Sequence, residues 1–378
     1  MKKPQERNTH RTWIEIDRKA IEKNTKTLKS LLGEKHMMAV VKSNAYGHGM
    51  IESARAALAG GASWLAVDEL AEAIELRENG LKVPILVLGH TLPSLFKAAA
   101  DKKISLTVSS LESLQNLAKT KLPKKLRIHI KFDTGLHRQG ILETHLQQAM
   151  RVLGTKGFPA ILEGAYTHFA AMEDPMRRDY SDMQARTFRG ILDKLRQKGF
   201  APLTHASASS GILFSKDFHF DMARAGIALY GLWPSPEIRK WSDGVELSPA
   251  LSWKSIVSEV KLVNKGAKVG YDLTYEAPRN SRLAVVPVGY WHGLPRSLSN
   301  KGKVLIRGKK AAIVGRISMD MAVVDVTDIP SVRQGDEVVL IGSQDRERMS
   351  AEEVAEAAGS INYEIVTRIN PLIPRLPR

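Results

Sequence analysis

Short apolar runs alternate with amphipathic stretches over the first two thirds of the chain. Most of these runs show no alternation of polar and apolar residues, which is typical of strands buried on both faces of a parallel sheet. They occupy residues 37–41, 64–67, 85–88, 105–108, 126–132, 162–167, 203–206 and 222–224. The pattern therefore predicts eight strands in parallel arrangement.

The stretches between these strands have apolar residues at helical spacing. Helices are predicted at residues 18–32, from about residue 50, and at 68–79, 109–119 and 179–198. Asp17 is placed to cap the first of them, and Gly80 and Gly199 follow the ends of two others, as C-cap preferences predict. Ser109, three residues before Glu112, predicts a capping box.

Eight strands that alternate with helices predict a (β/α)8 TIM-like barrel over residues 1–248. The alternative is an open, doubly wound sheet. That fold normally carries a glycine-rich GxGxxG loop after its first strand, and no such loop follows residues 37–41.

The pattern changes after residue 249, where short strands and turns predominate. Strands are predicted at residues 256–263, 282–288, 304–307, 312–314, 321–326 and 337–341. One helix is predicted at 351–358, with Ser350 as N-cap and Glu353 at the capping-box position. Residues 249–378 are therefore predicted to form a mostly β domain, with which a strand at about 12–17 is expected to pack.

Composition limits the class of protein. The 378 residues carry a formal charge of +16 and no cysteine, so a disulfide framework or thiolate metal site is excluded, and we expect no metal. The basic residues are interleaved with acidic ones, which indicates a basic surface; nucleic-acid binding is an alternative that only the charge supports. We find neither a secretory signal nor an apolar stretch long enough to cross a membrane, and expect a cytoplasmic protein.

The first predicted barrel strand leads directly into Lys42. A glycine-containing polar turn, residues 43–49, comes next. Burial at a strand end disfavours the charged ammonium and lowers the pKa of a lysine, which suits an amine that bonds to a carbonyl cofactor. The structural alternative is a lysine whose stem is buried and whose amine reaches water.

Further polar residues follow other predicted strands, at the end of a barrel where catalytic groups collect. Taken singly, Arg138 suits a surface cation, His168 a core histidine and Ser209 a helix cap. Together they share one face with Lys42. Ser209, Gly226 and the amide of Ile227 lie after the last two strands, where barrels often bind phosphate.

A lysine opposite a phosphate site points to pyridoxal 5′-phosphate (PLP) as cofactor. Arg224 would then lie near the pyridine nitrogen. Because an arginine cannot accept a proton, the ring would stay largely unprotonated, which favours removal and return of a proton over transamination.

Residues 39–49 closely resemble the PLP-lysine motif of the alanine racemase family. The resemblance extends in order over nearly the whole chain, through residues 131–138, 166–169, 224–231, 271–275, 288–290, 314–320 and 361–364. It implies a fold-type III PLP enzyme that interconverts L- and D-alanine for peptidoglycan, as a head-to-tail homodimer with shared active sites.

The resemblance also implies roles for individual residues. Lys42 would hold PLP and act as the base on one face of the substrate, and Tyr275 of the partner subunit would act on the other face. Lys131 matches a lysine that is carbamylated in many members. Cofactor contacts are implied for Tyr46, Arg138, His168, Ser209, Arg224, Gly226, Ile227 and Tyr363, and substrate contacts for Arg138, Tyr290, Met319 and Asp320.

Several positions depart from the family pattern. Other functions of related proteins also remain as alternatives. The departures are His137, Ala208, Trp291, His292 and Ser318. A broad-specificity, serine or lysine racemase of the same fold is the nearest alternative. A related decarboxylase would have a glutamate where Arg224 stands, and a non-catalytic PLP-binding protein would lack the β domain.

Overall fold

The computed structural model describes residues 9–378, which form two compact units. Residues 19–45 and 50–249 form the first, here called the barrel unit. Residues 9–18, 46–49 and 250–378 form the second, here called the β unit. Among residues 9–378, no helix is long and apolar enough to cross a membrane.

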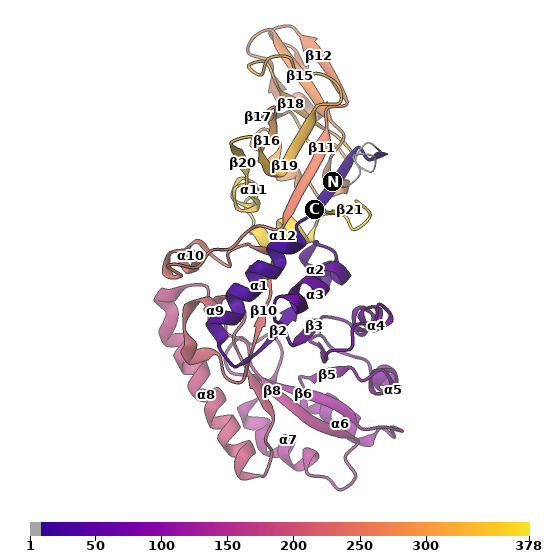
Figure 1. Cartoon of the computed structure of the whole chain (residues 1–378), viewed down its shortest axis with the longest axis vertical. Helices are drawn as coiled ribbons and strands as arrows, with labels where there is room; N and C mark the ends of the chain where they lie inside the picture. Colours follow the sequence, from indigo (N-terminus) through magenta and orange to yellow (C-terminus); the bar gives the residue numbers. More distant parts are fainter. Residues whose placement is uncertain (1–8) are drawn as a thin grey trace. The chain divides into compact units, whose positions relative to one another are not determined.

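Eight parallel strands close into a barrel in the barrel unit, which confirms the predicted fold class (Figure 1). Their order is β5-β4-β3-β2-β10-β9-β8-β6, and pairing of β5 with β6 closes the ring. The short strand β7 (Ile141–Leu142) adds to β6. The barrel strands are β2 (His36–Val40), β3 (Trp64–Val67), β4 (Ile85–Val87), β5 (Ser105–Val108), β6 (Leu126–Asp133), β8 (Ala160–Tyr166), β9 (Leu203–His205) and β10 (Met222–Ala225).

Helices connect these strands, as the sequence predicts. They are α1 (Arg18–Leu32), α2 (Lys42–Tyr46), α3 (Met50–Ala59), α4 (Leu70–Glu78), α5 (Phe96–Asp101), α6 (Leu111–Lys119), α7 (Leu146–Leu153), α8 (Arg178–Gln197), α9 (Ser209–Phe214) and α10 (Pro236–Trp241). The capping box predicted at Ser109 is wrong. Ser110 is the N-cap of α6, and its hydroxyl accepts from the backbone N–H of Ser113, so Glu112 is not at the box position.

The β unit is built on one large, mainly antiparallel sheet of order β12-β15-β18-β17-β16-β19-β11-β1-β21, with β20 paired to β19 (Figure 1). β1 pairs antiparallel with β11, so the strand at the start of the chain belongs to this sheet. The strands are β1 (Thr12–Ile16), β11 (Leu251–Ile256), β12 (Glu259–Val263), β15 (Ser281–Val286), β16 (Lys303–Ile306), β17 (Lys309–Val314), β18 (Ala322–Asp325), β19 (Glu337–Gln344), β20 (Glu347–Met349) and β21 (Arg375–Pro377).

Smaller elements complete the β unit. β13 (Lys268–Val269) and β14 (Tyr275–Glu276) form a separate hairpin. α11 (Ala351–Ala358) has the predicted capping box between Ser350 and Glu353, and α12 (Asn362–Thr367) follows it. The single strand predicted at residues 256–263 is wrong, because β11 ends at Ile256 and β12 begins only at Glu259.

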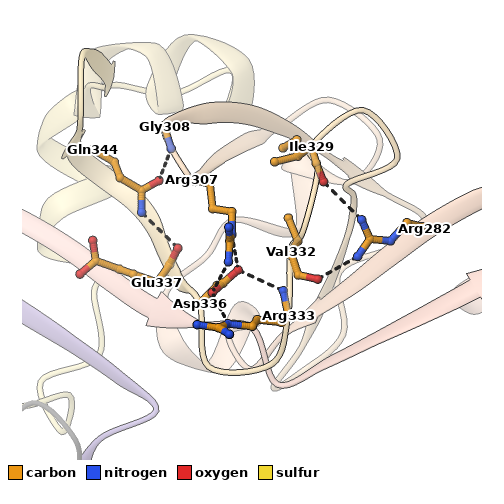
Figure 2. A network of polar contacts seen from close by, with 9 residues as sticks. All are labelled: Arg282, Arg307, Gly308, Ile329, Val332, Arg333, Asp336, Glu337 and Gln344. Carbon is orange, nitrogen blue, oxygen red and sulfur yellow. Dashed lines mark hydrogen bonds and ion pairs between the residues drawn. The ribbon is translucent and has the colours of Figure 1, made fainter.

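Arginine side chains fasten the turn before β19 (Figure 2). Arg307 donates through Nε to Oδ2 of Asp336 over 2.6 Å, and the same carboxylate accepts from the backbone N–H of Arg333. Arg282 donates to the carbonyl of Val332 over 2.8 Å. These contacts give hydrogen-bond partners to backbone groups of this turn and to the carboxylate of Asp336.

Candidate active site

A left-handed turn presents Lys42 at the end of β2. Ser43, Asn44 and Ala45 each have φ near +54°, a conformation that costs roughly 1–2 kcal/mol per residue outside glycine. The backbone N–H of Ser43 donates to Oε1 of Glu72 over 2.6 Å, and Oδ1 of Asn44 accepts from the N–H of Met50 over 3.0 Å. Strain held by such contacts is typical of functional positions.

The ammonium group of Lys42 donates to Oδ1 of Asp68 over 2.9 Å. Both side chains are partly exposed, at 36% for Lys42 and 45% for Asp68. Asp68 was not among the site residues predicted from the sequence. Its position was a usable signal, because it is the residue directly after β3 and thus lies at the same barrel end as Lys42.

Arg224 lies within β10, and acceptors surround the Nη atoms of its buried guanidinium. Nη1 lies 2.7 Å from Nδ1 of His205, and Nη2 lies 2.9 Å from the carbonyl oxygen of Thr167 and 2.8 Å from that of Ala206. Nη2 also lies 3.0 Å from Nδ1 of His168. Burial lowers the pKa of Arg224 to about 10, so the group remains a cation at neutral pH.

His168 is therefore held as a neutral imidazole. Burial lowers its pKa well below the usual range, and the nearby cations Arg224, Lys131, Arg138 and Lys42 lower it further. Because a guanidinium can only donate, Nδ1 of His168 accepts and its proton resides on Nε2.

Lys131 and Arg224 lie over the same aromatic ring. Nζ of Lys131 is 5.7 Å and Cζ of Arg224 is 5.0 Å from the ring centroid of Tyr166. Lys131 also donates to Oε1 of Gln139 over 3.3 Å. Burial, then Arg224 and Arg138, lower the pKa of Lys131 to about 8, while burial raises the pKa of Tyr166 to about 12.

The carboxyl end of the barrel thus gathers an excess of positive charge. The cations are Lys42, Lys131, Arg138 and Arg224, and they act on one another and on His168. Asp68 and Asp133 oppose only part of this charge. Such a site is suited to ligands that carry phosphate and carboxylate groups.

The loops after β9 and β10 meet through Ser209. Its hydroxyl accepts from the backbone N–H of Gly226 over 2.9 Å and from that of Ala228 over 3.3 Å. Ile227, between them, is buried and begins a 3-10 turn. Ala208, at the N-cap of α9, supplies no side-chain acceptor, so Ser209 is the side chain that joins the two loops.

The other predicted site residues belong to the β unit, which brings them together in two groups. The rings of Tyr46 and Tyr363 lie 6.3 Å apart. Separately, the segment of Tyr290 is joined to that of Met319 and Asp320. There the N–H of Tyr290 donates to the carbonyl of Ser318 over 3.1 Å, and that of Trp291 to the carbonyl of Met319 over 2.9 Å.

His292 lies in the same turn as Tyr290 and bonds to the backbone of that turn. It is buried, and its Nδ1 accepts from the backbone N–H of Gly289 over 3.2 Å. Burial lowers the pKa of His292, although Asp320 opposes this shift. The departure at position 292 therefore has a structural role in the turn.

Tyr275 lies on β14, paired with Val269. Burial, followed by the charge of Asp325 and a hydrogen bond with it, raises the pKa of Tyr275. Within one chain this shift is the opposite of what a phenol needs to act as a base. Within its own unit, Tyr275 therefore lies in surroundings that keep the phenol protonated.

Two aromatic residues that contact Arg224 inside the barrel, Tyr166 and His205, were not predicted as site residues from the sequence. Tyr166 was included only in a motif, and His205 only in the strand predicted at residues 203–206. Both are inward-facing residues near the ends of barrel strands, and their rings stack 4.6 Å apart. An inward position on a barrel strand was the signal that could have identified them.

Comparisons with known proteins agree over both units. Residues 16–234 match the family model described as alanine racemase, N-terminal domain, and residues 250–377 match alanine racemase, C-terminal domain. The chain is 42% identical over 375 residues to alanine racemase from Halothermothrix orenii, covering 98% of this chain and 97% of that protein.

Solved structures show the same likeness. The crystal structure of alanine racemase from Bacillus anthracis with bound L-Ala-P superposes with a TM-score of 0.92 at 39% identity, covering 98% of this chain and 95% of that one. The crystal structure of alanine racemase from E. faecalis gives a TM-score of 0.90 at 34% identity, covering 98% of this chain and 99% of that one.

Proposed function

The chain belongs to the alanine racemase family, and from this premise we propose that it interconverts L-alanine and D-alanine with PLP as cofactor. The observation that carries the proposal is the placement of the Lys42 amine and the Arg224 guanidinium at the same end of one barrel. The first offers an amine for a carbonyl cofactor, and the second a permanent donor for a ring nitrogen.

The chemistry of the donor set fits PLP. The phosphate would be held by Ser209, Gly226 and Ile227 at the loop junction, and by Tyr46 and Tyr363. Within the barrel unit, the excess of cations favours the anionic phosphate. When bound, PLP supplies the electron sink that makes the Cα proton of an amino acid removable.

Two of the chain's own groups would then move that proton. Lys42 would take or give it on one face of Cα, and Tyr275 of the partner subunit on the other. Inversion needs an acid–base group on each face. Arg138, with the amide of Met319 of the partner subunit, would bind the substrate carboxylate, while Tyr290 and Asp320 would line the approach of the substrate.

Arg224 would hold the ring nitrogen without giving up a proton, since it is a cation whose Nη atoms already donate to His205, Thr167 and Ala206. His168 is neutral, with its proton on Nε2, and would donate a hydrogen bond from Nε2 to the phenol of Tyr275 of the partner subunit. Hydrogen bonds and cations of this kind are what a tyrosine needs to act as a base.

We propose a homodimer in which each chain supplies Tyr275 to its partner. Exposed apolar side chains around Tyr275 and Met319 support this, because a second copy would cover them. They are Tyr271, Leu273, Tyr290, Trp291, Met319 and Met321, each at least 44% exposed.

Lys131 is suited to carbamylation. With a pKa of about 8, part of its amine is neutral near neutral pH and can attack CO2, forming an N–C bond and releasing one proton. The resulting carbamate would be an anion beside Arg138, which it would orient toward the substrate. We further propose, from the family, a cytoplasmic enzyme that supplies D-alanine for peptidoglycan.

The test is cofactor attachment combined with turnover. Purified protein incubated with PLP and reduced with borohydride should carry one PLP on the peptide that contains Lys42, and L-alanine should lose its circular dichroism. Lys42→Ala should show neither. Unmodified wild-type protein would refute the proposal, whereas equal rates on serine, lysine and alanine would favour a broad-specificity racemase.

A further inference from the structure

A column of polar side chains runs through the barrel interior from Arg224. Nη1 of Arg224 lies 2.7 Å from Nδ1 of His205, and Nε2 of His205 lies 2.9 Å from Nδ1 of His129. Among residues 9–378 the buried Nε2 of His129 has no well-directed hydrogen bond, and it lies 3.4 Å from Oε2 of Glu163. The four groups form a continuous series.

The column lies inside the barrel, since its members contact one another across strands that are not neighbours. His129 is on β6 and His205 on β9, with β8 between them. The ring of His129 also meets Trp64 of β3 at 5.4 Å, although β4 and β5 separate those strands. Both histidines are fully buried, so bulk solvent does not reach their ring nitrogens.

Glu163 ends the column near the amino-terminal end of the barrel, opposite to Lys42. Its carboxylate accepts from the hydroxyl of Ser105, the first residue of β5, and from Nη1 of Arg127 over 2.7 Å. Burial raises the pKa of Glu163, but the contact with His129 and the hydrogen bonds from Ser105 and Arg127 outweigh this and bring the pKa down to about 2. The group is therefore a carboxylate at neutral pH.

A register shift in β8 and the absence of a side chain at Gly164 leave room for this column. The register of β6 and β8 shifts at Glu163, since Ile128 pairs with Leu162 and His129 with Gly164. A Cβ atom on Gly164 would lie 2.1 Å from Nδ1 of His129, so only glycine leaves room for the ring. A β-bulge that aims a side chain beside a functional site is a recurring device.

The proton positions on the two histidines follow from the groups at the ends of the column, Arg224 and Glu163. Arg224 only donates, so Nδ1 of His205 accepts and Nε2 of His205 carries the proton. That N–H donates to Nδ1 of His129, which leaves the His129 proton on Nε2, facing Glu163. The carboxylate only accepts, so it matches this arrangement and opposes the reverse one.

We propose that Glu163 acts as a positioning residue, which sets the tautomers of His129 and His205 and thereby keeps an acceptor in place for Arg224 at the other end of the barrel. Burial keeps both imidazoles neutral, because it lowers the pKa of each. The final link, from Arg224 to the cofactor ring, rests on the proposed function; the tautomers do not.

Glu163→Gln is the informative change, since it keeps the shape of the side chain. Arg127 requires the amide oxygen of the new side chain, so the NH2 group faces Ser105 and His129. His129 must then accept on Nε2 and carry its proton on Nδ1, which forces the proton of His205 onto Nδ1, against Arg224. The single variant should therefore reverse both tautomers.

Removing Arg127 as well should restore the original arrangement. In the Arg127→Ala, Glu163→Gln double variant, the amide is free to turn its oxygen toward His129. Arg127→Ala alone keeps the carboxylate and should leave the column unchanged. A merely structural role for Glu163 predicts no such rescue, because the double variant has lost more contacts than the single one.

The experiment is ¹⁵N NMR of ring-labelled histidines in the full-length protein, with His129→Gln and His205→Gln used for assignment. Wild type and Arg127→Ala should show protonated Nε2 at both residues, with a low-field His129 proton typical of a bond to a carboxylate. Glu163→Gln should show protonated Nδ1, and the double variant protonated Nε2.

The PLP-loaded enzyme provides a second measurement. Glu163→Gln should lose roughly tenfold in kcat with less change in KM, as for outer partners of other sites, and the double variant should recover most of it. Wild-type His205 protonated on Nδ1, an absent low-field His129 proton, or tautomers unchanged by Glu163→Gln would overturn the proposal. The tautomers are measured without turnover. A wild-type protein that has no racemase activity would therefore refute the proposed function and not this proposal.

Discussion

The ammonium group of Lys42 is bound to the carboxylate of Asp68 across 2.9 Å, so the amine proposed to hold PLP is ion-paired in the protein alone. The amine must leave this pair before it can bond to the cofactor. In the proposed enzyme, Asp68 would therefore oppose cofactor uptake while it keeps the lysine side chain oriented near the barrel end.

We predict that Asp68→Asn accelerates PLP uptake by protein stripped of cofactor. Both partners are partly exposed, and such pairs contribute about 0.2–1 kcal/mol, so the rate should rise by no more than about fivefold. Stopped-flow absorbance measures it. Glu75→Gln removes the same charge from an exposed position on α4 and is the control.

Salt provides an independent check of the same pair. High ionic strength screens exposed charges, so the wild-type uptake rate should rise toward that of Asp68→Asn. Equal rates for wild type and Asp68→Asn at low salt, or a Glu75→Gln variant that is equally fast, would show that the pair does not restrain Lys42.

Carbamylation of Lys131 should depend on pH, because only the neutral amine reacts with CO2. With a pKa of about 8, the neutral fraction is roughly one tenth at pH 7 and nine tenths at pH 9. At constant dissolved CO2 the adduct should therefore increase over this range. ¹³C NMR with labelled CO2 measures it, and Lys131→Arg is the control that cannot react; a signal that persists in this variant would assign the adduct elsewhere.

Gly164→Ala should destabilise the barrel. The added Cβ would overlap the ring of His129, and overpacking of this kind costs about 1–3 kcal/mol. Gly190, within α8, has no atom within 4 Å of the position that an added Cβ would take, and it provides the matched control. Gly190→Ala should stabilise by roughly 0.5–1 kcal/mol, since alanine is the better helix former. Urea unfolding compares the two; equal midpoints would mean that the His129 ring has room to move.

Local patterns predicted much of the fold. The helix at 351–358 was identified from Ser350, Glu353 and apolar spacing, all of which act within a few residues, and the structure has α11 at those bounds. The barrel followed from eight separate apolar runs, each a local signal. Lys42 was identified because a charge directly after an apolar run is unusual.

Features that depend on distant partners were not predicted. Apolar residues recur at strand-like spacing through residues 256–263. However, the N–H of Val257 bonds to the carbonyl of Asp336 and that of Ser258 to the carbonyl of Val285, which divides the segment between two partners. β21, which contains Pro377, did not read as a strand because proline removes a ladder donor; it forms an edge beside β1.

In the site, too, residues marked by local patterns were predicted, and residues that depend on distant partners were not. Strand-end residues such as His168 and Arg224 were identified from their positions, because the barrel geometry places all strand ends together. Glu163 was not identified, since a bulge in β8 turns it toward His129 and no pattern along the chain reports such a shift in register.

In the proposed homodimer, an amine of one chain and a phenol of the other act on opposite faces of one substrate. Lys42→Ala and Tyr275→Phe should each be inactive alone. When the two are dissociated, mixed in equal amounts and reassociated, half of the dimers are mixed, and each of these has one intact site, so about a quarter of wild-type racemisation should return. Racemisation that stays at the level of the separate variants after confirmed exchange of subunits would contradict the account.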